Sequence, residues 1–425
     1  MNKLVANQYI QILKEELVPA IGCTEPIAIA YASAKARATL GDVATRIDVY
    51  CSGNMIKNAR CVTVPNTHEL SGIEASAVIG MVGGNDLEGL QVIANVCDEH
   101  IKQAQVYLNQ GICHVHHLKS EASLHIIMEM INTKDKVSVE IKDTHTNIVK
   151  ITKNNEIIYE SEKTGSQYQS KLINRDILNV DDIYHFAKGT PLDEVKDIIN
   201  QQIKCNMAIA EEGLKGEYGI GIGQVLLDSI VDCSIFTKCK AYAAAASEAR
   251  MGGCSMPVIT NSGSGNQGMT ASVPVIVYAK DRGYSEEELL RALLFSNLIT
   301  IHQKTGIGRL SAFCGAVSAA CASGAALSFI EGGTLKQIEM CIINTLANIP
   351  GIVCDGAKVS CAAKIATCLD AAFMSHLLAM ENRCYKCHEG ILKKNIEETI
   401  SAVGRIGRYG MKTCDEEILD IILDK

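Results

Sequence analysis

Three cysteines in the C-terminal half are the residues whose types and spacing could do chemistry. Cys314 follows the run Arg309-Leu310-Ser311-Ala312-Phe313, and Cys354 and Cys361 flank residues 355–360. A cysteine in a loop, a glycine that allows close approach, and a second cysteine seven residues on near a helix start can converge on one metal cluster. The spacing is not a CxxC series, and 18 cysteines are present, so it permits a cluster without specifying one. A free cysteine is often only a small buried hydrophobe.

A glycine-rich run, Gly263-Ser264-Gly265-Asn266-Gln267-Gly268, matches the GxGxxG pattern of dinucleotide-binding proteins. That pattern requires a helix immediately after it, and Pro274 leaves room for barely one turn. We therefore expect no dinucleotide site here. Residues 261–266 instead suit a nest of backbone N–H groups and small side chains that grips a carboxylate.

Bulk composition narrows the class of protein. The chain has 425 residues, a net charge of -8 and 47% hydrophobic content, which gives no basic surface for nucleic acid or anionic membrane. The weakly polar run Ala316–Ile330 is shorter than the ~20 residues that span a bilayer, so we predict an interior helix there. No targeting segment is visible, and we expect a cytoplasmic protein whose thiols serve metal binding or thiol chemistry rather than disulfides.

The periodicity predicts an α+β protein: a large all-α catalytic bundle that includes the N-terminal helices, and a smaller α+β domain with an antiparallel sheet. We expect N-terminal helices over 1–43, the α+β domain over 44–165 and the all-α domain over 166–425. The polar segment 163–169 marks the second boundary. Strands are predicted at 46–51, 123–131, 136–142, 147–152 and 156–160.

Helices are predicted from apolar spacing, the first over 2–17 and a second that begins near Thr24, with Pro26 in its first turn. Further helices are expected at 73–82, 87–109, 180–187, 192–214, 225–247, 285–297, 335–344, 357–379 and 396–403.

Several motifs in fixed order carry a resemblance to a known family. They are residues 22–26 (GCTEP), 52–58 (SGNMIKN), Val64-Pro65, 261–269, the run from Gly306 into Cys314, and 354–358. With these motifs the chain resembles the L-cysteine desulfidase family, relatives of the iron–sulfur L-serine dehydratase alpha chain, over almost its whole length.

The resemblance implies a [4Fe–4S] cluster held by Cys314, Cys354 and Cys361, with one iron left open for a small amino-acid substrate. The implied reaction converts L-cysteine to pyruvate, ammonia and sulfide by α-proton removal and β-elimination. Cys23 is the expected base, because the dipole at a helix start lowers the pKa of a thiol. It could instead pack inertly or act as a transient fourth ligand.

Other residues are candidates for acid–base chemistry and substrate binding. Glu25 could orient Thr24, cap its helix or bind the substrate ammonium, and His302 is either a second acid–base group or an interior histidine. Groups that could bind the substrate are Thr24, Asn54, Lys57, Asn261, Ser262, Asn266, Lys304 and Arg309.

Two alternatives stay open at this point. L-serine dehydratase would use the same cluster with a hydroxyl leaving group, although the Ser/His-rich loop we associate with that branch is replaced by residues 22–26. A cluster-bearing redox sensor without turnover is the second. The sequence leaves open whether the chain forms a homo-oligomer.

Overall fold

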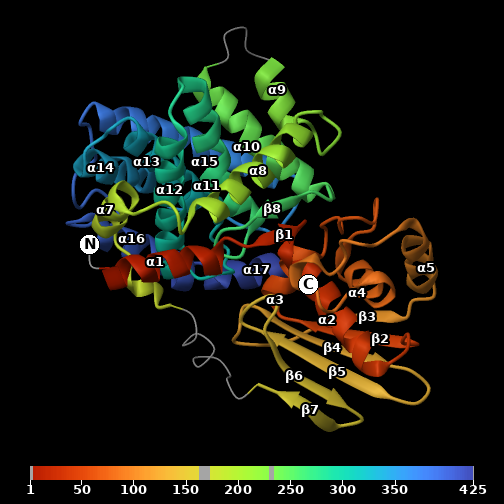
Figure 1. Cartoon of the computed structure of the whole chain (residues 1–425). Coiled ribbons are helices and arrows are strands. Elements are labelled where there is room, and N and C mark those ends of the chain that lie inside the picture. Colours follow the sequence, from red (N-terminus) through yellow and green to blue (C-terminus); the bar gives the residue numbers. More distant parts are fainter. Residues whose placement is uncertain (1–2, 162–172, 229–233, 425) are drawn as a thin grey trace.

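The computed structural model describes residues 3–161, 173–228 and 234–424, and the boundary predicted at 165 lies outside these ranges. Figure 1 shows a helical bundle beside a smaller part that contains a sheet, so the protein is α+β as predicted. Two hydrophobic clusters underlie this division, one within the bundle and one between the sheet and its helices.

The bundle is built around apolar helices that cover one another on most sides. α13 has all fifteen of its residues buried, as predicted for a fully interior helix, and packs against α11, α12 and α15. The helices of this part are α1 (Lys3–Glu16), α7 (Val180–Gly189), α8 (Lys196–Gly213), α9 (Ile222–Asp228), α10 (Ile235–Met251), α11 (Gly265–Arg282), α12 (Glu286–Ile307), α13 (Ala316–Ile330), α14 (Leu335–Asn348), α15 (Cys361–Met380) and α16 (Ile396–Arg405), with short turns η2 (Arg175–Ile177) and η3 (Ile406–Gly410). The last helix, α17 (Lys412–Ile422), packs on helix α3 (Gly53–Ala59) of the smaller part, and its Leu419 is buried in the cluster of the sheet.

The smaller part holds a six-stranded mixed sheet in the order β3-β2-β4-β5-β6-β7. β2 pairs in parallel with β3, and the remaining pairs are antiparallel. The sheet is therefore mixed, whereas we expected an antiparallel one. Its elements are α2 (Thr24–Leu40), β2 (Arg46–Cys51), α3 (Gly53–Ala59), α4 (Gly72–Gly83), η1 (Gly89–Gln91), α5 (Asp98–Asn109), β3 (Cys113–His117), β4 (His125–Ile131), β5 (Lys136–Lys142), β6 (Ile148–Lys153) and β7 (Glu156–Glu160).

The two N-terminal helices belong to different cores, which corrects the expectation that both complete the bundle. Ile12 and Leu13 of α1 are buried in the cluster of the bundle. Ile27 and Ile29 of α2 are buried in the cluster of the sheet, and α2 packs on α4, β4 and β5. Between these helices, β1 (Pro19–Ile21) pairs antiparallel with β8 (Pro257–Ile259) from the bundle. The chain therefore crosses from one core to the other at residues 19–23.

Two predicted helices are interrupted. The segment 87–109 contains the short turn η1 and then α5, because the residues between them form turns rather than a continuous helix. The segment 225–247 is divided between α9 and α10, and the residues between these helices are partly outside the described chain. Ser234 begins α10 by accepting a hydrogen bond from the Thr237 amide, which is a regular N-cap.

Pro274 lies inside α11, and this overturns our reason for rejecting a helix after residue 268. A proline has no N–H, so the carbonyl of Thr270, four residues earlier, loses its helical partner. The hydroxyl of Ser323 on α13 donates to that carbonyl at 2.5 Å. The neighbouring helix therefore satisfies the group that proline leaves unpaired. The dinucleotide fold is still absent from this region, because the preceding strand β8 lies in a two-stranded antiparallel sheet rather than a parallel βαβ unit.

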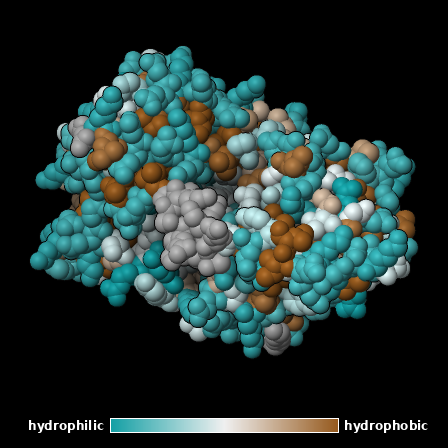
Figure 2. All heavy atoms as spheres, turned by 60° about the horizontal axis from the view of Figure 1, so that its bottom comes forward, coloured by the Kyte–Doolittle hydropathy of each residue, from teal (hydrophilic) through white to brown (hydrophobic). Residues whose placement is uncertain are grey.

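The surface that carries the outer strands of the sheet is largely hydrophilic, with separate hydrophobic patches (Figure 2). β7 is exposed throughout, including Ile157, Ile158 and Tyr159. One helix, α15, is long and apolar enough to cross a membrane by length and composition, and half of that window is buried inside the fold. It packs against α10, α13 and α14, as a core helix does.

Candidate functional site

A small cavity lies where the bundle meets the α+β part. Its volume is about 100 Å³, below the roughly 300–1,000 Å³ of pockets for drug-sized ligands. The site therefore suits a ligand of a few atoms and excludes a dinucleotide. The predicted site residues that line it are Cys23, Glu25, Ser262, Asn266, Lys304, Arg309, Cys314, Cys354 and Cys361.

The start of a helix lies at the cavity in four places. Cys23 caps α2, Ser264 caps α11, Gly315 caps α13, and Cys361 is the first residue of α15. All four residues line the cavity. The amino-terminal end of a helix carries partial positive charge and unpaired N–H groups. The fold therefore makes this cavity favourable for anions, such as thiolates and carboxylates.

Cys314 and Cys354 are brought together by a short backbone pairing. The Cys314 amide donates to the Ile352 carbonyl at 2.9 Å, and the Cys354 amide donates to the Ala312 carbonyl at 2.7 Å. Phe313 and Val353 form the antiparallel bridge between these bonds. Two loops forty residues apart in sequence thus present their thiols side by side.

The third thiol, that of Cys361, lies at the far end of the loop that begins at Cys354. The loop turns at Gly356, whose φ of +105° favours glycine. A Cβ on Gly356 would lie 2.2 Å from the Lys57 carbonyl, so the loop packs closely on α3. Cys361 is half-buried, and its Sγ lies 3.7 Å from the Gly356 carbonyl oxygen.

The proton equilibria of these thiols are strongly perturbed. The hydrogen bond with Cys314 holds the pKa of the Cys354 thiol below its usual value against the opposing effect of burial, and the charge of Lys57 adds to this. The same hydrogen bond and burial raise the pKa of Cys314. Burial lowers the pKa of Lys304 to about 8, although the two nearby thiols act in the opposite direction. Thiols close to one another and to a buried cation are the donor type that binds soft metals.

Cys23 and Glu25 form a buried pair. The Cys23 thiol donates to Oε2 of Glu25 at 3.0 Å, and the same oxygen accepts from the Thr24 hydroxyl at 3.1 Å. Burial, together with the charge of Glu25, raises the pKa of Cys23 well above its usual value. This corrects the expectation that the helix dipole lowers it. Burial alone would raise the pKa of Glu25, but His145 and the Cys23 thiol hold it below its usual value.

The pair is fixed in place from both parts of the molecule. Asn58 of α3 donates to Oε1 of Glu25 at 3.0 Å. The Gly263 carbonyl lies at the same distance, 3.1 Å, and is the alternative acceptor for the single proton of the Thr24 hydroxyl. Thr24 therefore connects α2 to the turn before α11, and it does not line the cavity. The carboxylate of Glu25 is therefore hydrogen-bonded directly to the α+β part through Asn58 and connected to the bundle through Thr24.

The turn before α11 combines structural and exposed groups. Asn261 is fully buried and donates to Asn297 on α12, so it supports the turn from behind. The Ser262 hydroxyl donates to Asn261 at 2.9 Å, with Ser262 in the left-handed region at φ +51°. Asn266 accepts from Arg250 at 3.1 Å. Ser262 and Asn266 line the cavity, so the expected carboxylate-binding turn stays a prediction at this position.

The predicted cations differ in how far they are already paired. Arg309 lines the cavity and donates to Glu16 at 3.0 Å. Lys57 pairs with Asp415 of α17 and does not line the cavity. It affects the site through its charge on Cys354 rather than through contact with a ligand.

Two candidates lie away from the cavity. His302 pairs with Glu397 of α16, with 2.7 Å between Nε2 and Oε2, which fits the interior-histidine alternative. Asn54 lies at the start of α3 and does not line the cavity, whereas Asn58, one helical turn later, does. Residues four apart lie on the same face of a helix. Of the two asparagines on this face of α3, Asn58 is the one that lies at the level of the cavity.

Sequence reasoning missed His145, Arg250, Asn58 and Gln267, all of which line the cavity. Arg250 is buried on α10 and donates from Nε to the Gly22 carbonyl at 2.9 Å. A buried arginine is rare unless paired, but burial is not visible in the sequence of an alanine-rich helix. His145 comes from the turn between β5 and β6, far from the other site residues in sequence.

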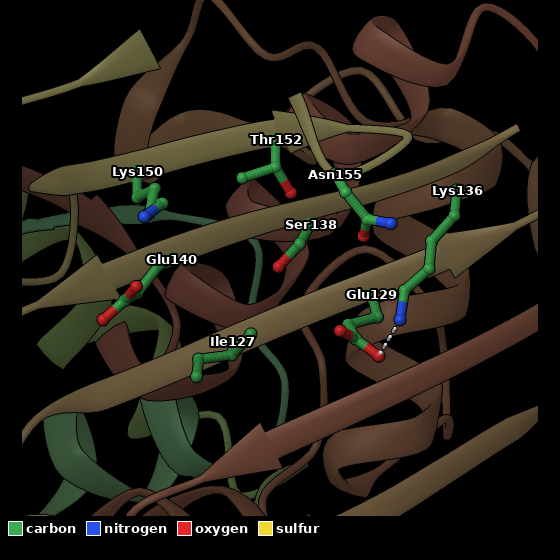
Figure 3. A pocket seen from close by; sticks show the side chains of 8 residues that line it. All are labelled: Ile127, Glu129, Lys136, Ser138, Glu140, Lys150, Thr152 and Asn155. Atoms are coloured by element: carbon green, nitrogen blue, oxygen red, sulfur yellow. Dashed lines mark ion pairs between the residues drawn. The ribbon is translucent and has the colours of Figure 1, made fainter. Parts of the chain in front are cut away.

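A second hollow lies on the open face of the sheet (Figure 3). Its charged groups are already paired: Lys136 with Glu129 at 3.1 Å, Lys150 with Glu160 at 3.1 Å, and Glu140 with His125 at 2.8 Å. A pairing of this kind is expected between neighbours on a polar sheet face. We therefore assign no chemistry to this hollow.

The donor set at the main cavity fits an iron–sulfur cluster. In the described ranges, no three His, Cys, Asp or Glu side chains converge on a point that would hold a single metal ion. A cluster does not require such convergence, because its thiolates bind different iron atoms. Three thiols on one cavity, surrounded by helix starts and by Lys304, provide soft ligands and neutralising charge.

Comparison with known proteins then places this architecture in a class. The model of the serine dehydratase alpha chain family matches residues 87–420, more than half of the chain. The chain is 48% identical over 427 residues to a UPF0597 protein of Treponema denticola, covering 100% of this chain and 99% of the relative. A UPF0597 protein of Finegoldia magna is 47% identical over 98% of this chain and 99% of its own length. The protein therefore belongs to the serine dehydratase alpha chain family.

Proposed function

We propose that the protein is an iron–sulfur-dependent lyase that converts L-cysteine and water to pyruvate, ammonia and sulfide. The observation that carries this proposal is the position of the Cys23–Glu25 pair on the same small cavity as three further thiols and the cationic side chains of Arg250, Lys304 and Arg309. An acid–base pair, an anion-binding turn and a set of soft metal ligands are the three components that β-elimination from an amino acid requires.

Substrate binding follows from the charge distribution. A carboxylate at the Ser262–Asn266 turn would meet the amino-terminal end of α11 and the side chains of Arg309 and Lys304. The buried Glu25 carboxylate lines the same cavity and suits the substrate ammonium. A cavity of about 100 Å³ lined by Cys23 favours a substrate with a short side chain.

Proton transfer uses the Cys23–Glu25 hydrogen bond. Because the thiol is protonated and the carboxylate is ionised, Cys23 accepts the α-proton as its own proton moves to Glu25. The Cα–H bond breaks, its electron pair forms the Cα–Cβ double bond, and the Cβ–S bond breaks to release sulfide. The aminoacrylate then tautomerises and hydrolyses in water to pyruvate and ammonia.

The cofactor is the [4Fe–4S] cluster that Cys314, Cys354 and Cys361 would hold, and when bound it supplies Lewis-acid iron for the leaving group. Soft thiolates are good ligands of iron, which favours a sulfur leaving group. We place the reaction in the cytoplasm, with a small amino acid as the partner molecule and with no nucleic acid or membrane.

L-serine dehydratase is the second candidate, and the family match favours it. The same cavity would bind serine, with hydroxide as the leaving group. Anaerobically purified protein should be assayed for pyruvate from each amino acid and for sulfide from cysteine, together with its iron and acid-labile sulfide content. Far greater efficiency with serine would overturn the cysteine assignment.

A cluster-bearing sensor would also contain iron and sulfide, so the cofactor alone does not identify an enzyme. Turnover that is lost in Cys23→Ala while the cluster stays bound separates the two classes. Absence of pyruvate from both amino acids, in a preparation with a full cluster, would reject the lyase.

A further inference from the structure

The α+β part contributes one side chain that no step above uses. His145 lies in the turn between β5 and β6 and lines the cavity beside Glu25 and Arg309. Its ring lies near the turn before α11: a Cβ built on Gly263 would be 3.6 Å from Cε1 of His145 and 3.0 Å from a terminal nitrogen of Arg309. The ring and the guanidinium therefore meet at the same small patch of backbone.

This histidine is buried without a protein partner for one ring nitrogen. Only 6% of the residue is exposed, and Nε2 has no hydrogen-bond partner in the described part of the chain. Buried polar atoms are nearly always hydrogen-bonded, so an unpaired nitrogen on a side chain that lines a cavity points to a ligand atom.

The turn that carries His145 is held firmly. The Lys142 amide donates to the Asn147 carbonyl at 3.1 Å, and the Asn147 side-chain amide returns a bond to the Lys142 carbonyl at 2.9 Å. Asp143 takes a left-handed conformation at φ +70°, and its amide donates to the Leu124 carbonyl. The sheet thus fixes the backbone from which the ring extends before any ligand binds.

The charges around the ring indicate which ligand atom it meets. Burial lowers the pKa of His145, with Arg309 and Arg250 acting in the same direction and Glu25 opposing them. A neutral imidazole has one N–H donor and one acceptor nitrogen. The groups that face the ring are Glu25, Arg309, Arg250 and the Gly263 turn. A donor beside two guanidinium groups and a helix start is matched to an anionic oxygen.

We propose that His145 is a substrate-binding residue that donates a hydrogen bond from Nε2 to the carboxylate of the amino acid, next to Arg309. The proposal rests on the proposed function only in taking an amino acid as the ligand. It gives the α+β part a second role beside that of Cys23 and Glu25, because the carboxylate site then includes a side chain from the sheet.

The test uses two substitutions of His145, of which only one keeps an N–H donor near the position of Nε2. His145→Gln places an amide nitrogen close to the position of Nε2, whereas His145→Phe keeps the ring and removes the donor. Binding of L-alanine, which has the carboxylate and ammonium but no leaving group, should be measured by calorimetry on anaerobically purified full-length protein. Cysteamine, which has the ammonium and thiol but no carboxylate, is the matched ligand.

We expect His145→Phe to weaken L-alanine binding by about 10- to 100-fold, the effect of losing a hydrogen bond to a charged group. His145→Gln should stay within about threefold of the original protein, and cysteamine should bind all three proteins equally. His114→Phe, a change at an exposed histidine of β3, should leave both affinities unchanged.

Three results would overturn the proposal: L-alanine binding that is absent from the original protein, that is unchanged in His145→Phe, or that is lost together with cysteamine binding. The last would indicate a general structural effect. Failure of the proposed reaction is distinguishable, because it would leave His145-dependent L-alanine binding in a protein that produces pyruvate from neither amino acid.

Discussion

The thiol of Cys23 donates a hydrogen bond to the carboxylate of Glu25 at 3.0 Å, and both groups are buried at the start of α2. Glu25 also accepts from Asn58 at 3.0 Å. The thiol therefore begins as a proton donor to a fixed carboxylate, and it can act as a base only by passing its own proton on.

This relationship predicts that substitution of either residue alone abolishes turnover. Cys23→Ala and Glu25→Gln should each lower kcat by at least ~100-fold, the lower end of the effect of losing a positioned acid–base group. Iron content and visible absorption should stay unchanged, because neither residue is a proposed ligand. Cys61→Ala, at an exposed cysteine, is the control and should keep full activity. Normal kcat in Glu25→Gln would rule out the relay.

The three thiols at the cavity are predicted to hold the cluster. Cys314→Ser, Cys354→Ser and Cys361→Ser should each lower the iron and acid-labile sulfide content of anaerobically purified protein and remove its visible absorption, because a cluster needs thiolate ligands. Cys387→Ser, at an exposed cysteine on the loop before α16, should keep both. A full iron content in any two of the three cavity variants would show that other residues are the ligands.

The contact of α11 with β8 predicts a large effect of a single methyl group. A Cβ on Gly268 would lie 2.0 Å from the Ile259 carbonyl oxygen, so the helix or the strand must move. We expect Gly268→Ala to lower the free energy of unfolding by about 1–3 kcal/mol, the usual cost of overpacking. Gly189 is the last residue of α7, and a Cβ built there would have no atom within 4 Å. Gly189→Ala should therefore be neutral or slightly stabilising. Urea unfolding of both variants measures the difference, and equal midpoints would contradict the close contact.

A buried carboxylate in the sheet predicts a pH-dependent contribution to stability. Hydrogen bonds from Arg46 and His116, with burial opposing them, lower the pKa of Asp48 from 3.8 to about 2. Because the folded-state value is the lower one, the stabilisation is complete above about pH 4–5 and is lost as the pH falls toward 2. The loss should be on the order of 1–2 kcal/mol, reduced by the exposure of Arg46.

The measurement is urea unfolding at pH 6, 4 and 3. Asp48→Asn should be less stable than the original protein at pH 6, and the difference should shrink at pH 3, because the aspartate of the unfolded chain becomes protonated at a higher pH than that of the native protein. A difference that stays constant over this range would show that Asp48 stabilises the sheet by packing rather than by charge.

Local patterns were sufficient for many elements. Alternation of apolar residues located β5 at 136–142, because a strand with one face on a core must bury every second residue. The pattern also located β7 at 156–160, although all five of its residues are exposed. The uninterrupted small and apolar residues of 316–330 indicated a helix buried on all sides. Pro274 misled the prediction, because the group that rescues it, the Ser323 hydroxyl, is fifty residues away.

At the site, the sequence by itself determined which residues are chemically capable: the thiols, Glu25, the cations and the glycine-rich turn before α11. Only the tertiary structure decided which of them share a cavity. It paired 312–314 with 352–354, directed Lys57 and His302 to partners elsewhere, raised the pKa of Cys23 and delivered His145 from a β-turn. The physical reason is that side-chain chemistry is a local property, whereas burial, proximity and pKa depend on chain segments that only the folded cores bring together.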